Sequence, residues 1–335
     1  MTPPGALMRS ELAEAAAVFA NTVRTVLSGS NAAQIAALNP TAIYTIARGS
    51  SDAAASILSY EFMRETGKPM TSLPPSIFSV GRGVDMSGVL ALVVSQSGAS
   101  NDLVLSAQGA RARGATVIAL INAPDSPVAE HAHITLPIGA GPELAVPATK
   151  SVIGSIAAGM ALLSLLVPAY AARAEASAHA FDTLNPTLPQ SKALITALLR
   201  AHHIYIIGRD TGYGAAQELA LKLKETCALH AEAYSSSEVL HGPLQLATNP
   251  LLVLILDTGQ PDLQASLDTA EARFRANGGT VHRLRPADVG AKDLTPAAAA
   301  ALLLYLAYPP VLNTALALGL DPDRPATLSK VTQTT

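Results

Sequence analysis

Two stretches of the chain share one pattern of apolar and polar positions. The first begins at Ile43 and reads IYTIARGSS, followed by AAASILSYEFMRE. The second begins at Ile204 and reads IYIIGRDTG, followed by AAQELALKLKE. Each is a short apolar run, a turn of small and polar residues, and a segment with apolar positions three to four residues apart. The pattern therefore predicts a strand, a turn and a helix that occur twice.

Further strand and helix patterns alternate after each copy. In the first, LALVVS precedes the helical segment NDLVLSAQGARARG, and ATVIALIN and HITLPI follow as strands. In the second, LLVLILD precedes DLQASLDTAEARFRANGG, and TVHRL follows. Strands that alternate with helices are typical of parallel sheets covered by helices on both faces. We expect an α/β fold with two such sheets.

These patterns suggest a division of the chain into segments. We expect an N-terminal helical segment at 1–38, a first α/β domain at 39–172, a linker at 173–201, a second domain at 202–320 and a C-terminal tail at 321–335. Charges interrupt the apolar pattern of the N-terminal segment, which indicates an amphipathic helix and not a signal peptide.

Two long apolar segments need a separate interpretation. Residues 151–172 carry no charge and are long enough to span a bilayer. No second segment of this kind and no aromatic belt accompany them, which favours a helix buried in a core or an interface. The segment AAAAALLLYLAYPPVLNTALALGL predicts a second buried helix, broken at Pro309-Pro310. We expect a cytoplasmic protein.

Composition narrows the classes of partner. Of 335 residues, 49% are hydrophobic and 14% charged, which is typical of a compact globular protein. The net charge is −3 and basic runs are missing, which argues against nucleic acid as a partner. The single cysteine, Cys227, excludes a disulfide framework within the chain, and we interpret it as a buried apolar filler.

Two polar turns carry the candidate chemistry. Gly49-Ser50-Ser51 and the run Ser95–Ser100, SQSGAS, each follow a predicted buried strand and precede a helix. In parallel sheets, ligands bind beyond the carboxyl ends of the strands, where helix N-termini present free N–H groups. Hydroxyls and backbone amides around glycine suit a phosphate monoester. From the residues alone, ordinary turns and helix caps explain the pattern equally well.

Several motifs together resemble the sugar isomerase (SIS) family. They are GSS, SQSG, the stretch from Glu143 to Lys150 (ELAVPATK), ELALKLKE, HAEAYSSSEVLHGPL and the closing DRPATLSKVTQ. The resemblance runs from about Leu38 to the end, and it is closest to SIS-type glucosamine-6-phosphate deaminases and to the isomerase half of glucosamine-fructose-6-phosphate synthase. It implies two tandem SIS domains, each a flavodoxin-like three-layer sandwich.

The resemblance also implies roles for three ionisable residues. Glu225 matches the glutamate that transfers a proton between C1 and C2, although its spacing also fits a helix-surface partner of Lys222. His241 matches the histidine that opens the sugar ring and that the neighbouring subunit contributes. Lys330 matches the lysine that meets the carbonyl end of the open-chain sugar. The implied substrate-binding residues are Ser50, Ser51, Ser95, Gln96, Ser97, Ser100, Val146, Ala148 and Lys222.

The implied substrate is an amino-sugar phosphate, bound by a homodimer with shared active sites. The glutaminase domain of the synthase has no counterpart in this sequence, which favours glucosamine-6-phosphate deaminase, with release of ammonia. An aldose–ketose isomerase, a fructosamine-6-phosphate deglycase and a non-catalytic sugar-phosphate sensor remain alternatives. This chemistry requires no metal and no organic cofactor, and Glu130-His131-Ala132-His133 is interpreted as a polar strand entry and not a metal site.

Overall fold

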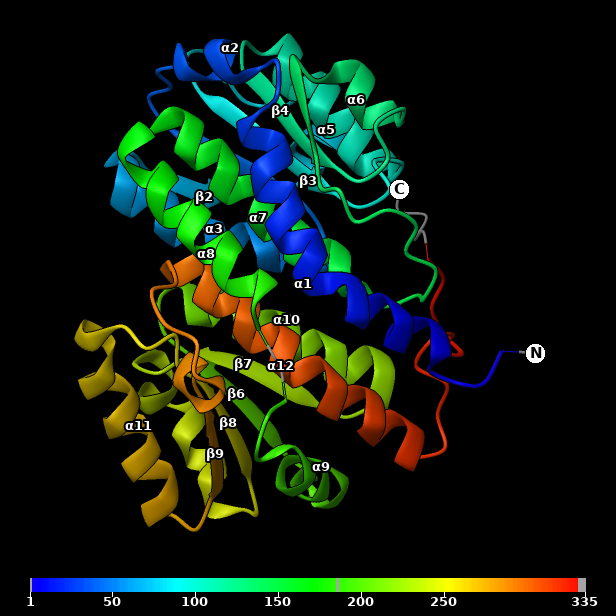
Figure 1. Cartoon of the computed structure of the whole chain (residues 1–335), viewed down its shortest axis with the longest axis vertical. Coiled ribbons are helices and arrows are strands. Elements are labelled where there is room, and N and C mark those ends of the chain that lie inside the picture. Colours follow the sequence, from blue (N-terminus) through cyan, green and yellow to red (C-terminus); the bar gives the residue numbers. More distant parts are fainter. Residues whose placement is uncertain (1, 185–186, 331–335) are drawn as a thin grey trace.

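The strands of the chain form two sheets in which neighbouring strands run parallel (Figure 1). The computed structural model describes residues 2–184 and 187–330. The first sheet has the order β2-β1-β3-β4-β5 and the second the order β7-β6-β8-β9. The strands are β1 (Ile43–Ile46), β2 (Met70–Ser72), β3 (Leu90–Ser95), β4 (Thr116–Ile121), β5 (Ile134–Pro137), β6 (Ile204–Gly208), β7 (Ala231–Ser235), β8 (Leu252–Leu256) and β9 (Thr280–Leu284). The expected α/β fold with two helix-flanked parallel sheets is confirmed.

Helices lie between the two sheets and on their outer faces. The α-helices are α1 (Ala6–Leu27), α2 (Ala32–Ala36), α3 (Gly49–Thr66), α4 (Ser76–Ser79), α5 (Asn101–Ala112), α6 (Pro127–His131), α7 (Lys150–Leu166), α8 (Ala171–Asp182), α9 (Ser191–Arg200), α10 (Thr211–Cys227), α11 (Gln264–Ala276) and α12 (Pro296–Ala317). Short 3₁₀ turns occur at η1 (Pro168–Tyr170), η2 (Glu238–His241), η3 (Pro243–Thr248), η4 (Pro261–Leu263) and η5 (Pro286–Val289).

One buried core joins the two sheets. Side chains from α1, α3, α7, α10 and α12 pack together with the facing side chains of both sheets in a single apolar cluster. Smaller clusters lie under α5 on the far face of the first sheet and under α11 on the far face of the second. The central helices therefore form a layer that both sheets share, as Figure 1 shows, and they bring parts of both halves to one place.

The two long apolar segments are buried, but their ends differ from the prediction. The helix expected over 151–172 is α7, which ends at Leu166. Pro168 causes this, because the residue before a proline is driven toward extended backbone, and Val167 has φ −131° and ψ 87°. The predicted break at Pro309-Pro310 is wrong, since α12 continues through both prolines to Ala317. Burial of α12 against α10, α7 and α1 outweighs the lost N–H donors.

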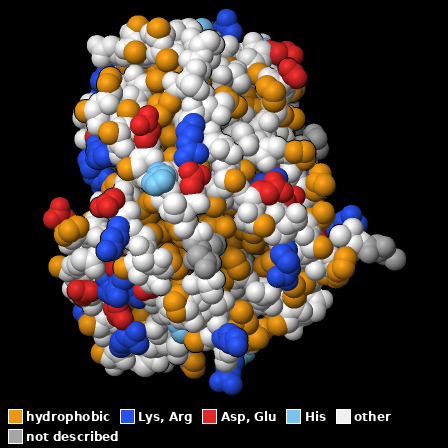
Figure 2. All heavy atoms as spheres, viewed as in Figure 1, with side chains coloured by type: hydrophobic (Ala, Val, Ile, Leu, Met, Phe, Trp, Pro, Cys, Tyr) orange, Lys and Arg blue, Asp and Glu red, His pale blue; other side chains and the backbone are white. Residues whose placement is uncertain are grey.

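Helix α12 is the one described helix that is long and apolar enough to cross a membrane. Of its most apolar window, 83% is buried inside the protein, where it packs as a core helix. The expected linker, 173–201, contains most of α8 and all of α9, which pack on α1 and α12 respectively. On the face in Figure 2, acidic and basic side chains are interspersed among the described residues, in keeping with the small net charge.

Buried polar groups fasten the central helices to one another. Glu61 of α3 is fully buried and accepts hydrogen bonds from the Tyr170 hydroxyl (2.7 Å) and from the Ala297 N–H at the start of α12 (2.5 Å). Burial raises the pKa of the Glu61 carboxyl to about 7.

His133 also has a structural role, because its Nδ1 accepts a hydrogen bond from the Val117 N–H of β4 (2.9 Å).

The helices α3 and α10 approach so closely that a glycine is required between them. A Cβ at Gly214 of α10 would lie 2.6 Å from the backbone nitrogen of Ile57 and 3.0 Å from the carbonyl oxygen of Ala53, both in α3. Backbone atoms cannot move aside as a side-chain end can. The contact fixes α10 against α3, and these two helices carry residues of the candidate site described below.

We expect Gly214→Ala to lower the free energy of unfolding by about 1–3 kcal/mol, because the added methyl group overpacks this crossing. The measurement is denaturant unfolding followed by circular dichroism. Gly242→Ala is the matched control, since a Cβ at Gly242 meets nothing within 4 Å and its φ of −169° suits any residue. Equal midpoints for the two variants would contradict the importance of the α3–α10 contact.

Candidate active site

The two polar turns lie side by side at one edge of the first sheet. Strands β1 and β3 are neighbours, and their carboxyl ends lead into the N-termini of α3 and α5. Gly49 (φ +54°) and Gly98 (φ +60°) adopt the left-handed backbone that lets the chain turn there. The Ser95 hydroxyl accepts the N–H of Gly98 (3.0 Å) and closes the second turn. Two helix N-termini therefore converge where an anion can be held.

The C-terminal tail crosses to this edge through a series of hydrogen bonds. The Asp323 carboxylate accepts the backbone N–H groups of Leu7 (2.9 Å) and Met8 (2.8 Å) at the start of α1. The Asp323 carbonyl accepts the N–H of Val146 (2.9 Å). These bonds fix the tail beside the loop before α7, and they place Lys330 there as well.

Lys330 is held by the loop that precedes α7. Its Nζ donates to Glu143 Oε2 (3.1 Å) and to the Ala145 carbonyl (2.7 Å). Glu143 is buried and also accepts from the Ser151 hydroxyl (2.6 Å) and the Thr149 N–H (2.9 Å). Burial alone would raise the pKa of the Glu143 carboxyl, but the Lys330 charge and these donors outweigh it and lower the pKa. Glu143 is therefore a carboxylate, and it keeps Lys330 at the cavity.

Helix α10 brings a carboxylate to the same place from the second half of the chain. Glu225 is 22% exposed and forms an ion pair with Lys222, which is fully buried. Lys222 also lies 3.5 Å from Glu218 Oε1. Burial opposes the charged ammonium, but the carboxylates of Glu218 and Glu225 outweigh it and raise the pKa of Lys222. Lys222 is thus charged, and its ion pair orients the Glu225 carboxylate from the buried side of the site.

Glu218 ends this buried chain of polar groups. Tyr308 of α12 donates to its Oε1 (3.1 Å), while Oε2 is buried without a hydrogen-bond partner among the described residues. Burial raises the pKa of the Glu218 carboxyl to about 7, against the opposing effect of Lys222.

A cavity of about 310 Å³ collects most of the residues that the sequence indicates. Those that line it are Ser50, Ser51, Ser95, Gln96, Ser97, Ser100, Val146, Ala148, Glu225 and Lys330. Two are not in the lining. Lys222 is buried behind Glu225 and contacts it, and His241 lies exposed at the end of η2 in the second half of the chain. The last residues of the tail, 331–335, lie outside the described residues.

The structure adds residues that sequence reasoning missed. Arg48, Leu328 and Ser329 line the cavity, and Glu143 and Glu218 support Lys330 and Lys222. The available signals were adjacency and motif membership, since Arg48 directly precedes Gly49 and Glu143 opens the ELAVPATK stretch. Glu218 likewise opens the ELALKLKE motif, but its role depends on which side of α10 is buried, and the sequence alone does not show this.

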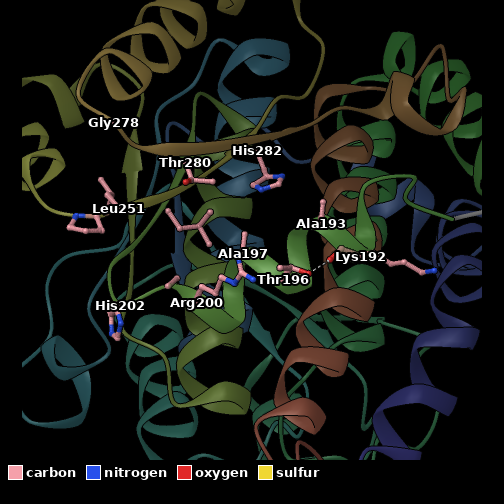
Figure 3. Close-up of a pocket in the computed structure, with 13 residues that line it drawn as sticks. Lys192, Ala193, Thr196, Ala197, Arg200, His202, Leu251, Gly278, Thr280 and His282 are labelled. Carbon is pink, nitrogen blue, oxygen red and sulfur yellow. Dashed lines mark hydrogen bonds between the residues drawn. The ribbon is translucent and has the colours of Figure 1, made fainter.

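A larger cavity, about 550 Å³, lies elsewhere (Figure 3). It is lined by α9 and by residues before and within β8 and β9, among them Arg200, Leu251 and His282. Figure 3 shows the Lys192 side chain extending away from the other labelled residues. The lining contains two histidines and no carboxylate. The smaller cavity combines Glu225 and Lys330 with the turns at the N-termini of two helices, and we therefore assign the chemistry to it.

The SIS domain model matches residues 38–165 and 197–285. The chain belongs to the SIS domain family. Its sequence is 34% identical over 331 residues to the glutamine–fructose-6-phosphate aminotransferase (isomerizing) of Symbiobacterium thermophilum, covering 90% of this chain and 53% of that protein. The chain thus spans about half the length of this curated relative.

Solved structures show the same SIS architecture. A candidate phosphosugar isomerase from Silicibacter pomeroyi DSS-3 is 32% identical, with a TM-score of 0.79 over 95% of this chain and 99% of that one. Glucosamine-6-phosphate deaminase from Thermotoga maritima is 19% identical, with a TM-score of 0.75 over 98% of this chain and 100% of that one. The second likeness shows a shared fold.

The buried Glu218 leads to a prediction about pH. The pKa of Glu218 is raised in the folded state, so the folded protein binds more protons than the unfolded chain between pH 4.5 and about 7. The stability that protonated Glu218 contributes is therefore present below pH 4.5 and is lost as the pH rises through 7. Relative to the wild type, Glu218→Gln should gain roughly 1–3 kcal/mol of unfolding free energy from pH 5 to pH 8.

Chemical denaturation at several pH values measures this difference. The control is Glu175→Gln, which makes the same change at an exposed position of α8. A constant difference between wild type and Glu218→Gln over this pH range would show that Glu218 does not titrate there.

Proposed function

We propose that the protein is a glucosamine-6-phosphate deaminase, which converts glucosamine 6-phosphate and water into fructose 6-phosphate and ammonia. The observation that carries the proposal is the meeting of Glu225 and Lys330 with the two serine-rich turns around one cavity. A phosphate site alone requires neither of these ionisable groups. A carboxylate beside a bound open-chain sugar can take the C2 proton and return it to C1.

The remaining steps follow from this proton transfer. The hydroxyls and helix N-termini of the turns hold the phosphate, which fixes the sugar relative to Glu225. Proton transfer from C2 to C1, together with transfer of a proton from the amine nitrogen to O1, converts the C1 aldehyde into an alcohol and the C2 amine into an imine. Water then adds at C2 and replaces the nitrogen, which gives the ketone and ammonia. Lys330, held by Glu143, interacts with the C1 end of the open chain.

The one cysteine of the chain is not part of the proposed chemistry. Cys227 is buried within α10, and burial raises the pKa of its thiol to about 11. The reactive form of cysteine is the thiolate, so we assign Cys227 no role in the reaction.

We expect Glu225→Gln to lower the rate of ammonia and fructose 6-phosphate release about 10²- to 10⁴-fold. Binding of the sugar phosphate should change only a few-fold, because the amide keeps the size of the side chain. Glu175→Gln serves as the control. Turnover of an aldose 6-phosphate that has a hydroxyl group at C2, without ammonia release from glucosamine 6-phosphate, would support an aldose–ketose isomerase instead. Binding without any turnover would support a sensor.

The placement of His241 supports a shared active site. It is exposed and is not part of the cavity lining of its own chain. We propose that the protein acts as a cytoplasmic homodimer in which the partner's histidine at this position assists ring opening, since histidine can carry a proton near neutral pH.

Mixed dimers test this arrangement. His241→Ala and Glu225→Gln should each be inactive alone. After subunit mixing, half of the dimers carry one subunit of each kind, and one of their two sites has both intact residues. We therefore expect recovery of about a quarter of wild-type activity. No recovery would show that His241 acts within its own chain, and an active His241→Ala variant would show that it has no role.

A further inference from the structure

Arg48 occupies a position between the two turns of the candidate site. It is the last residue before Gly49 at the N-terminus of α3, and it lines the cavity. Its ion-pair partner, Asp102, lies in the first turn of α5, two residues after Ser100. The pair therefore joins the N-termini of both helices that converge on the cavity. Neither residue was indicated by the sequence patterns.

The described residues bind only one edge of the Arg48 guanidinium. Its Nε donates to Asp102 Oδ2 (2.8 Å), and Asp102 is 1% exposed. The two Nη groups donate to no group among the described residues, and the Arg48 side chain is 53% exposed. A buried carboxylate thus anchors the arginine at its inner edge. The outer edge keeps the N–H groups whose fork geometry suits phosphate oxygens.

The charges around the cavity show why such a group is needed. Within the described part of the chain, the carboxylates that line the cavity or pair with its lining are Asp102, Glu143 and Glu225, and the cations are Arg48, Lys222 and Lys330. These charges balance, so the cavity has no cationic excess for a phosphate monoester with nearly two negative charges. Lys222 is buried against Glu225, and Lys330 is held by Glu143. Of these three cations Arg48 is the most exposed and keeps both Nη groups unused, whereas the Lys330 ammonium already donates to two groups.

We propose that Arg48 binds the substrate phosphate through its Nη groups, and that Asp102 is a positioning residue that holds the guanidinium toward the cavity. This inference rests on the proposed sugar-phosphate site and adds to it the group that carries most of the charge recognition. The serine hydroxyls and the helix N-termini then supply neutral donors on the other sides of the phosphate. No covalent step is involved.

The test is equilibrium binding of sorbitol 6-phosphate, measured by calorimetry. This hexitol phosphate has the chain length and phosphate of the open-chain sugar, and it has no carbonyl group for a C1–C2 proton transfer. We expect Arg48→Gln to bind it about 10- to 100-fold more weakly, the effect of removing a charge-assisted hydrogen bond. Arg48→Lys should bind with intermediate affinity, because it keeps the charge and loses the fork.

The matched control is Arg24→Gln, which removes a surface arginine that is 49% exposed and paired with Asp182. Its affinity should equal that of the wild type. The ratio of dissociation constants between Arg48→Gln and wild type should also grow from pH 5.5 to pH 8, because the phosphate gains its second charge near pH 6. A purely structural role for Arg48 would give no such dependence.

The outcomes separate the two proposals. If the wild type binds sorbitol 6-phosphate and Arg48→Gln binds it equally well, the role of Arg48 is overturned while the sugar-phosphate site stands. A weakened affinity with a ratio that stays constant with pH also overturns it, since Arg48 would then only shape the turn. If the wild type binds neither sorbitol 6-phosphate nor glucosamine 6-phosphate, the proposed function itself fails.

Discussion

The close packing of α10 on α3 is the contact on which the candidate site depends. Ser50 and Ser51 lie in the first turn of α3, and Glu225 lies near the end of α10. These residues come from the two halves of the chain, and only the crossing at Gly214 brings the helices close enough to share a cavity. Because protein interiors are closely packed, a small shift of α10 at this crossing would also move the Glu225 carboxylate relative to the cavity.

The repeated strand–turn–helix units place a cavity at the matching turn of each half, about 310 Å³ in the first and about 380 Å³ in the second, but the two turns differ in chemistry. In the second half, the turn after β8 begins with Asp257, where the first half has Ser95. The Asp257 carboxylate accepts the N–H of Gly259 (2.8 Å) and hydrogen bonds from Arg283 (3.0 Å) and Arg285 (3.1 Å). The second turn thus holds a carboxylate of its own, whereas the first offers its donors to the cavity.

The pattern of apolar and polar residues was sufficient to predict the fold, because the burial of each strand or helix determines which of its own positions are apolar. A run such as Leu90–Ser95 is buried on both faces, and this is what a parallel strand between helix layers requires. The turns were predictable for a related reason, since small and polar residues must follow such strands where the backbone N–H groups are free. The likeness to a known family then indicated Glu225 and Lys330, which no local pattern distinguishes from surface charges. The helix through Pro309 and Pro310 was mispredicted because proline weakens a helix locally, while the packing that outweighs it is distant in sequence.

By itself, therefore, the sequence determined the two parallel sheets, the order of their elements and the two polar turns, because these depend on neighbours along the chain. Only the tertiary structure decided which charges face one another. Lys222 is a buried cation because Glu218 and Glu225 flank it, Lys330 reaches the cavity because Asp323 and Glu143 hold the tail, and Arg48 is oriented by a buried Asp102. The energy of a charge is set by its burial and its partners, and both are fixed only when distant segments pack.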